Sequence, residues 1–238
     1  MIAAIVHYNT PKLTRAAVLS LRKHTPECSV VILDNSDRLT IGECPAWREL
    51  TEQPGVRVID NTRGQVMDFG KWLDGLQDKE PSPVNNYGSA KHCRSVQWLC
   101  DYMDEPFLLL DSDVLVRRDI TVFFAHPECV WAGEVGENVR RRFGYDIRKV
   151  QPFICYLNAP LMRQYGISYF NQDFMWNLTT KKPNHRYDTG AWFYKSCAES
   201  GLPVFELPIS EYIVHLGHGS WRERQPAKWL RQHRELWL

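Results

Sequence analysis

Two carboxylates stand one residue apart at the end of an apolar run near the middle of the chain. The run 107–110 leads directly into Asp111, Ser112 and Asp113, and the apolar pattern resumes at Val114. Carboxylates at the end of a buried strand are costly unless positive charge faces them. A divalent cation supplies that charge, and carboxylate oxygens suit Mg²⁺ or Mn²⁺. The alternative is a solvated turn whose aspartates do no chemistry.

Two histidines near the C-terminus offer a further ligand. His215 and His218 follow the apolar run 212–214 in a stretch that also contains Gly217 and Gly219. Neutral imidazole is a good ligand for transition metals, so a histidine here would favour Mn²⁺ over Mg²⁺. The alternative is that one histidine is a hydrogen-bonding core residue and the other is solvated.

The elements that must position these residues follow a strand and helix alternation. Short apolar runs typical of buried strands end in polar residues, at Tyr8 and Asn9 and again at Asp34. This pattern predicts a parallel α/β sheet that binds its ligand beyond the carboxyl ends of the strands. The expected strands are 3–8, 29–33, 56–59 and 107–110, and the expected helices are 11–23 and 89–103.

The order and offsets of these motifs resemble the nucleotide-sugar-binding half of family 2 glycosyltransferases with the GT-A fold. The resemblance implies one α/β domain over 1–238, a GT-A-like, Rossmann-type mixed sheet flanked by helices. Within it we expect a nucleotide-sugar-binding half at 1–116 and an acceptor and catalytic half at 117–219. A basic amphipathic tail then follows at 220–238.

The resemblance also implies roles for single residues on the donor side. Tyr8, Asn9 and Asp34 fall where the family holds the base and ribose of the donor. Asn86 and Gly88 fall on the family's Asn-x-Gly stretch near the base and diphosphate. Lys91 or His92 stands where that stretch ends in Asn, and Lys91 is retained as a donor-binding candidate.

The metal site is implied by the same resemblance. The family's Asp-x-Asp motif falls on Asp111 and Asp113, which places Asp111 and Ser112 beside the donor. Many enzymes of this fold complete the metal shell with a C-terminal histidine. His215 matches that position by its place on a strand, with His218 as the alternative.

An inverting transfer needs a carboxylate that takes the proton of the acceptor hydroxyl. Asp188, followed by a predicted helix at 190–200, resembles the family stretch that carries this base, although Tyr187 stands where the family has Glu. Asp188 is therefore the candidate base, with helix N-cap as the alternative role. Glu134, which follows an expected strand, is the second choice.

The acceptor site and the tail are weaker inferences from residue type. Sugars are held by amides, carboxylates and aromatic faces, which makes Asn158, Asp173 and Trp176 candidates for the acceptor site. The tail carries five Lys or Arg against two Glu, with Trp and Leu interleaved. Such a segment could contact an anionic membrane, dock on its own domain, or mediate self-association.

Composition narrows the class of protein. The chain has 238 residues, 44% of them hydrophobic and 24% charged, with a net charge of +1, which excludes disordered and fibrous classes and gives no reason to expect nucleic acid as a partner. Seven scattered cysteines favour reduced thiols. With no basic leader and no long apolar run, we expect a cytoplasmic protein, with the tail as a candidate contact at the inner face of the membrane.

These observations predict a metal-dependent glycosyltransferase. Its donor would be a nucleoside-diphosphate sugar of the UDP or dTDP type, and its acceptor a glycan or a lipid-linked glycan. We expect an inverting reaction in the synthesis of a bacterial surface polysaccharide. Two alternatives remain open: a nucleotidyltransferase, although no Gly-rich phosphate loop follows the first strand, and a sugar-binding module without catalysis.

Overall fold

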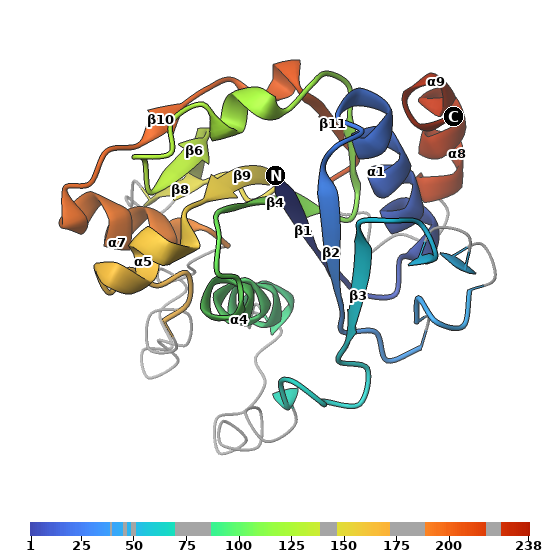
Figure 1. Ribbon diagram of the computed structural model, residues 1–238, viewed down its shortest axis with the longest axis horizontal. Coiled ribbons are helices and arrows are strands. Elements are labelled where there is room, and N and C mark those ends of the chain that lie inside the picture. The colour runs from blue at the N-terminus through green and yellow to red at the C-terminus, as the bar shows by residue number, and fades with distance from the viewer. Residues whose placement is uncertain are drawn as a thin grey trace.

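A seven-stranded sheet forms the centre of the computed structural model (Figure 1). The structure describes residues 1–38, 40–44, 47–48, 51–69, 87–138, 147–171, 189–217 and 225–238. The strand order is β10-β6-β9-β4-β1-β2-β3. These strands are β1 (Ile2–His7), β2 (Ser29–Asp34), β3 (Val56–Asp60), β4 (Phe107–Asp111), β6 (Trp131–Gly133), β9 (Ile154–Leu157) and β10 (Phe205–Glu206).

The sheet is mostly parallel, as expected for this fold class. β1 pairs in parallel with β2 on one side and with β4 on the other, and β2 pairs in parallel with β3. β9 runs antiparallel to both β4 and β6, which makes the sheet mixed. The carboxyl ends of β1, β2 and β4 therefore meet at one edge, with His7 beside Asp34 and Val6 beside Asp111.

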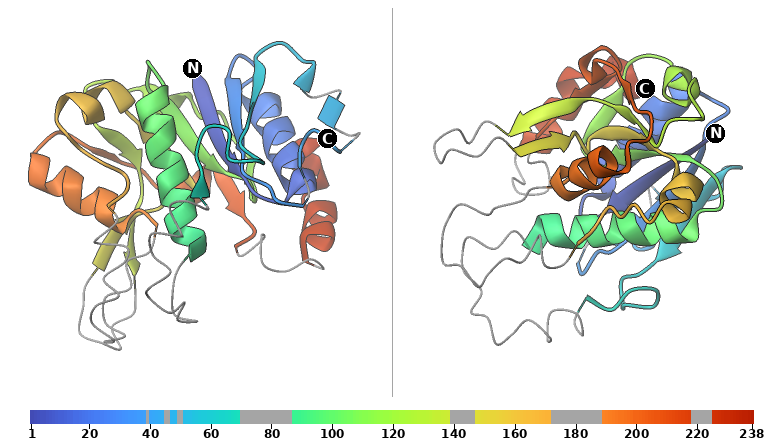
Figure 2. Two further views of the ribbon diagram at one scale, coloured as in Figure 1. Left: turned by 90° about the horizontal axis from the view of Figure 1, so that it is seen from below. Right: turned by 90° about the vertical axis from the view of Figure 1, so that its left-hand side faces the viewer.

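Helices cover both faces of the sheet because its strands are apolar on both faces. α1 (Pro11–His24) packs Ala17, Val18 and Leu21 on one face, and a proline stands in its first turn. The opposite face is covered by α4, α5 and α7 (Figure 2). Their bounds are α4 (Tyr87–Tyr102), α5 (Ala159–Gln164) and α7 (Ala191–Ser200).

Two small antiparallel ribbons flank the sheet. β5 (Val114–Val116) pairs with β11 (Ile213–His215), and β7 (Val135–Asn138) pairs with β8 (Ile147–Val150). Short 3-10 helices span Thr121–Phe124 and Ile209–Glu211. The first ribbon matters for the site, because it brings a late segment of the chain beside the residues that follow β4.

The C-terminal helices α8 (Gln225–Gln232) and α9 (Arg234–Trp237) pack on the outside of α1 (Figure 1). Trp229 and Leu230 are buried in a cluster with Leu13 and Leu115. Of the three uses considered for the tail, docking on its own domain is what the structure shows for 225–238. In the part of the chain that the structure describes, no helix is long and apolar enough to cross a membrane.

Candidate active site and metal centre

Asp111, Asp113 and His215 converge at the carboxyl edge of the sheet. One ligand atom from each lies within 4.8 Å of the others, a spacing that a single ion could bridge. His215 Nε2 lies 3.3 Å from Asp113 Oδ1, and the two side chains are 22% and 13% exposed. The group is thus shielded from bulk water but still open to a ligand.

Backbone pairing sets this geometry. The Asp111 amide donates to the Phe153 carbonyl at 2.9 Å, which fixes the end of β4. In the β5–β11 ribbon His215 stands opposite Val114, and the Leu216 amide donates to the Asp113 carbonyl at 3.0 Å. The His215 ring also packs on the Phe153 ring, with centroids 3.8 Å apart. Residues a hundred positions apart in sequence are therefore held together by strand register.

The donor atoms fit a divalent cation. Two carboxylate oxygens suit Mg²⁺ and Mn²⁺ equally, and the imidazole nitrogen favours the transition metal. Two partly buried carboxylates close together are also unfavourable without a facing positive charge. The three side chains could hold a divalent ion and leave its remaining positions to water and a ligand.

His92, which the sequence offered as the alternative to Lys91, is a neighbour of this cluster. It lies on α4, and its Nε2 is 3.7 Å from Asp111 Oδ1. Lys91, the residue before it, points its ammonium over the Phe69 ring at 5.6 Å. Consecutive residues of a helix point about 100° apart around its axis, so Lys91 and His92 contact different groups. The sequence alone could not decide which of the two lies beside the site.

The predicted base-binding residues Tyr8 and Asn9 form an exposed rim beyond β1. Asn9 Nδ2 and the Tyr8 hydroxyl donate to the two oxygens of Asp37 at 2.7 and 2.9 Å. The Asn9 side-chain oxygen in turn accepts from the Arg38 amide at 3.1 Å. Asn9 has a φ of 54°, the left-handed region that asparagine tolerates better than most residues. The rim is therefore built from two loops joined by side chains.

Electrostatics at the rim follow these bonds. The hydrogen bond from Asn9, together with the one from Tyr8, lowers the pKa of the Asp37 carboxyl. Partial burial, and then the bond to Asp37, raises the pKa of the Tyr8 phenol. Sequence reasoning missed Asp37 as a site residue, although it stands in the polar run 34–37 that follows β2.

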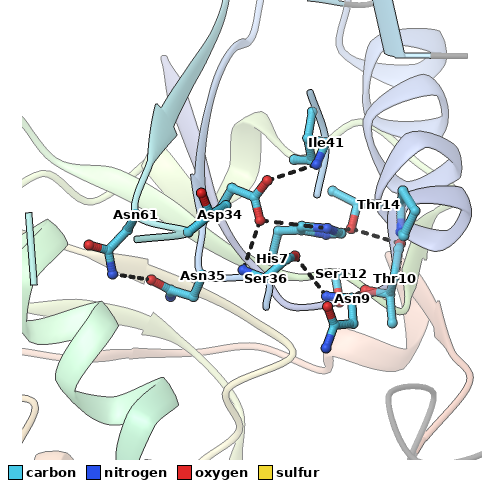
Figure 3. A network of polar contacts seen from close by, with 12 residues as sticks. His7, Asn9, Thr10, Thr14, Asp34, Asn35, Ser36, Ile41, Asn61 and Ser112 are labelled. Carbon is cyan, nitrogen blue, oxygen red and sulfur yellow. Dashed lines mark hydrogen bonds and ion pairs between the residues drawn. The ribbon is translucent and has the colours of Figure 1, made fainter. Parts of the chain in front are cut away.

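Asp34 is more buried than its neighbours on the rim, and Figure 3 shows its contacts with Ser36 and Ile41. It is 2% exposed, and its two oxygens accept from the amides of Ser36 at 3.0 Å and Ile41 at 2.8 Å. In this structure the carboxylate shapes the turn after β2. Any contact with a ribose, the role implied by the family resemblance, stays a prediction.

The other donor-side candidates are placed as follows. Ser112, between the two metal-site aspartates, accepts a hydrogen bond from the Thr10 hydroxyl at 3.2 Å. Gly88 lies in the first turn of α4. Asn86 lies outside the described residues.

Of the other site residues predicted in the second half of the chain, the structure describes two. Glu134 follows β6, and its Oε2 accepts from the Ile209 amide at 2.9 Å. Asn158 is 4% exposed and caps α5, accepting from the Leu161 amide and donating to the Pro127 carbonyl. The residues outside the described part of the chain are Asp173, Trp176, Asp188 and His218.

Neither the known protein-family models nor the curated protein sequences match this chain. Solved structures do. The galactosyltransferase LgtC with donor and acceptor sugar analogues is 14% identical, with a TM-score of 0.55 over 88% of this chain and 74% of that one. The glycosyltransferase GlyE of Streptococcus pneumoniae TIGR4 is 13% identical, with a TM-score of 0.57 over 97% of this chain and 59% of that one.

A third solved structure, residues 1–349 of S. aureus TarS in complex with UDP, is 12% identical, with a TM-score of 0.50 over 89% of this chain and 59% of that one. At such low identity the likeness concerns the fold. The chain has the GT-A fold of these glycosyltransferases, as the sequence predicted. The matches do not single out family 2.

Proposed function

We propose that this protein is a metal-dependent glycosyltransferase that moves a sugar from a nucleoside-diphosphate sugar to a hydroxyl acceptor. The observation that carries the proposal is the convergence of Asp111, Asp113 and His215 at the carboxyl edge of a GT-A sheet. That edge is also where the polar ends of β1 and β2 meet. Ligands of open α/β sheets bind in this position.

In this mechanism Asp111, Asp113 and His215 would hold the ion. A bound divalent ion offsets the negative charge that develops on the departing diphosphate. The pairing of β5 with β11, and the Phe153 ring against His215, keep the ligands in place before the donor arrives. The rim of Tyr8 and Asn9, fixed by Asp37, would orient the nucleoside.

The proposal assigns Asp188 as the base that takes the proton of the acceptor hydroxyl. Asp188 would take this proton as the hydroxyl oxygen attacks the anomeric carbon from the face opposite the diphosphate. The bond from the anomeric carbon to the diphosphate oxygen breaks as the new bond forms, so the anomeric configuration inverts. Glu134 is the alternative, with one carboxylate oxygen already bound by the Ile209 amide. Asp188→Asn and Glu134→Gln variants would separate the two, and the anomeric configuration of the product, read by NMR, tests inversion directly.

The first test of the function is calorimetric titration of UDP and dTDP with Mn²⁺ and with EDTA. We expect one nucleotide to bind only with the metal, and binding to disappear in an Asp111→Ala, Asp113→Ala double variant. The variant must keep its melting temperature for the result to count as loss of the site. Absence of nucleotide binding to the wild type under all conditions would contradict the proposal.

We extend the proposal to a glycan or lipid-linked acceptor in surface-polysaccharide synthesis. Surface charge supports a membrane-associated acceptor, because Lys228, Arg231 and Arg234 are exposed, whereas Trp229 and Leu230 pack inward. Attraction to an anionic bilayer would then be electrostatic and sensitive to salt. Sedimentation with phosphatidylglycerol vesicles that weakens as salt rises is the expected result.

A further inference from the structure

A buried polar network connects the ends of β1 and β2 with the start of α1. His7 and Thr14 are fully buried, and Asp34 is nearly so. His7 Nδ1 lies 2.7 Å from the Thr14 hydroxyl, and its Nε2 lies 3.9 Å from Asp34 Oδ1 (Figure 3). Desolvation of a buried polar group is costly unless it is hydrogen-bonded, and a network whose members are satisfied is rigid.

On one side the network reaches the exposed rim. Asp34 accepts from the amides of Ser36 and Ile41, which fixes the turn after β2. The Ser36 hydroxyl then accepts from the Asn9 amide at 2.9 Å. Asn9 and its partner Asp37 are therefore positioned, through two steps, by a carboxylate that His7 faces.

On the other side the network reaches the metal-site loop. The Thr14 hydroxyl donates to the carbonyl of Thr10, the N-cap residue of α1, at 3.2 Å. With that proton committed, Thr14 accepts from His7 Nδ1. The Thr10 hydroxyl donates to Ser112 Oγ at 3.2 Å, and Ser112 lies between Asp111 and Asp113. A continuous series of contacts thus runs from Asp34 to the middle of the metal-binding motif (Figure 3).

We propose that this network couples the nucleoside rim to the metal site, with His7 and Thr10 as positioning residues. The proposal rests on the proposed function. Ordering of the Asp111–Asp113 loop by the ion would fix Ser112 and Thr10, and through Thr14, His7 and Asp34 the rim that meets the nucleoside. Each ligand then binds a protein that the other has already ordered, which gives positive coupling through the chain itself.

The test uses a nucleoside, because a nucleotide would contact the ion directly through its phosphates. Uridine and thymidine are titrated against ¹⁵N-labelled protein, with Mg²⁺ and with EDTA, and the dissociation constant is read from the Asn9 and Ser36 amide signals. In the wild type we expect Mg²⁺ to tighten binding of one nucleoside about three- to tenfold, the effect of about one hydrogen bond.

Thr10→Val is the decisive variant. It removes the hydroxyl that reaches Ser112 and keeps the shape of the side chain, and the Thr10 side chain makes no capping hydrogen bond to α1. We expect nucleoside affinity in EDTA to stay at the wild-type value and the gain from Mg²⁺ to vanish. Thr121→Val is the matched control, because its hydroxyl bonds Asp119 at a remote, exposed position. Its gain from Mg²⁺ should equal that of the wild type.

Three results would overturn the coupling. The first is a wild-type nucleoside affinity that ignores Mg²⁺, or no nucleoside binding at all, while UDP or dTDP still binds with metal. The second is a Thr10→Val variant whose gain from Mg²⁺ equals that of the wild type. The third is an equal loss of affinity with and without Mg²⁺, which would make the hydroxyl only a support for the rim. If no nucleotide binds the wild type with metal, the proposed function fails and the coupling falls with it.

Discussion

Asp34 and the pair Asp111 and Asp113 occupy equivalent places in the sheet and have opposite surroundings. Each follows a buried strand at the same carboxyl edge, with β1 between them. Asp34 is 2% exposed and bonded by two backbone amides. Asp111 and Asp113 stay partly exposed and face His215 instead. A carboxylate at a strand end is thus part of the architecture in one case and available to a ligand in the other.

The difference lies in what satisfies the negative charge. At Asp34 the backbone N–H groups of the turn after β2 donate hydrogen bonds to the carboxylate. These bonds stabilise its negative charge without a bound cation. After β4, the pairing of β5 with β11 instead places the His215 ring beside the carboxylates of Asp111 and Asp113. Exposure and partner type, more than position in the sheet, separate a structural aspartate from a candidate metal ligand.

The largest effect should come from Asp113→Asn. Replacing an anionic ligand by an amide removes charge that the ion requires, so Mn²⁺ affinity should fall about a hundredfold or more. Stability should stay near that of the wild type, because asparagine has the shape of aspartate and keeps one acceptor oxygen. Asp101→Asn, on the exposed surface of α4, is the control, and water-proton relaxation of Mn²⁺ gives the affinity. Equal affinities in the two variants would contradict the assignment.

Asp34→Ala should lower stability and leave metal affinity nearly unchanged, the reverse of Asp113→Asn. It leaves the Ser36 and Ile41 amides without their acceptors and His7 without its facing carboxylate, at a cost of roughly 2–5 kcal/mol in the free energy of unfolding. Asp34→Asn keeps one acceptor oxygen and should cost less. Urea denaturation measures both, and Mn²⁺ affinity of the folded variants should remain close to that of the wild type. A stable Asp34→Ala protein that has lost its metal would reverse the comparison.

His215→Gln should have an intermediate effect and change which metal is preferred. Imidazole contributes more to Mn²⁺ than to Mg²⁺, so Mn²⁺ affinity should fall roughly tenfold while Mg²⁺ affinity falls less. His126→Gln, at an exposed position beside Glu128, is the control. Competition of Mg²⁺ against bound Mn²⁺ gives the ratio. An unchanged ratio would remove His215 from the metal shell and return His218 to consideration.

The smallest effect concerns Asp37. The hydrogen bonds from Asn9 and Tyr8 lower its pKa in the folded state, so its ionised form stabilises the fold above the unfolded pKa. That contribution is lost as the pH falls through the lowered value. The stability difference between wild type and Asp37→Asn, less than about 1 kcal/mol for an exposed group, should therefore shrink as the pH falls from about 5 to about 2. A difference that grows on acidification would contradict the sign.

Much of the fold could be predicted because local sequence patterns indicate its strands and its first helix. The apolar runs before Asn9, Asp34 and Asp111 became β1, β2 and β4, and Pro11 marks the first turn of α1 as expected. Sequence reasoning missed the β7–β8 ribbon and the short helix α5. Helix α5 begins at Ala159, after its N-cap Asn158, and its six residues are too few to show a periodic apolar face.

The candidate site could be predicted best where its chemically reactive side chains stand close together in the sequence. Asp111 and Asp113 stand out because two carboxylates after an apolar run need an explanation. His215 was also predicted, from its place after an apolar run and from the family resemblance. The contacts that His92 and Phe153 make with the cluster were not, because they depend on the packing of α4 and of the residue before β9, which no local pattern encodes. The burial of Asp34 could not be predicted either, because it depends on how the chain after β2 folds back to place the Ser36 and Ile41 amides against the carboxylate.

The measurement that tests the central claim most directly is anomalous diffraction from crystals grown with Mn²⁺ and UDP or dTDP. The account predicts a manganese peak bonded to Asp111, Asp113 and His215, with the diphosphate on the same ion and the nucleoside against Tyr8 and Asn9. A manganese peak elsewhere, or a nucleotide bound away from this edge of the sheet, would contradict it.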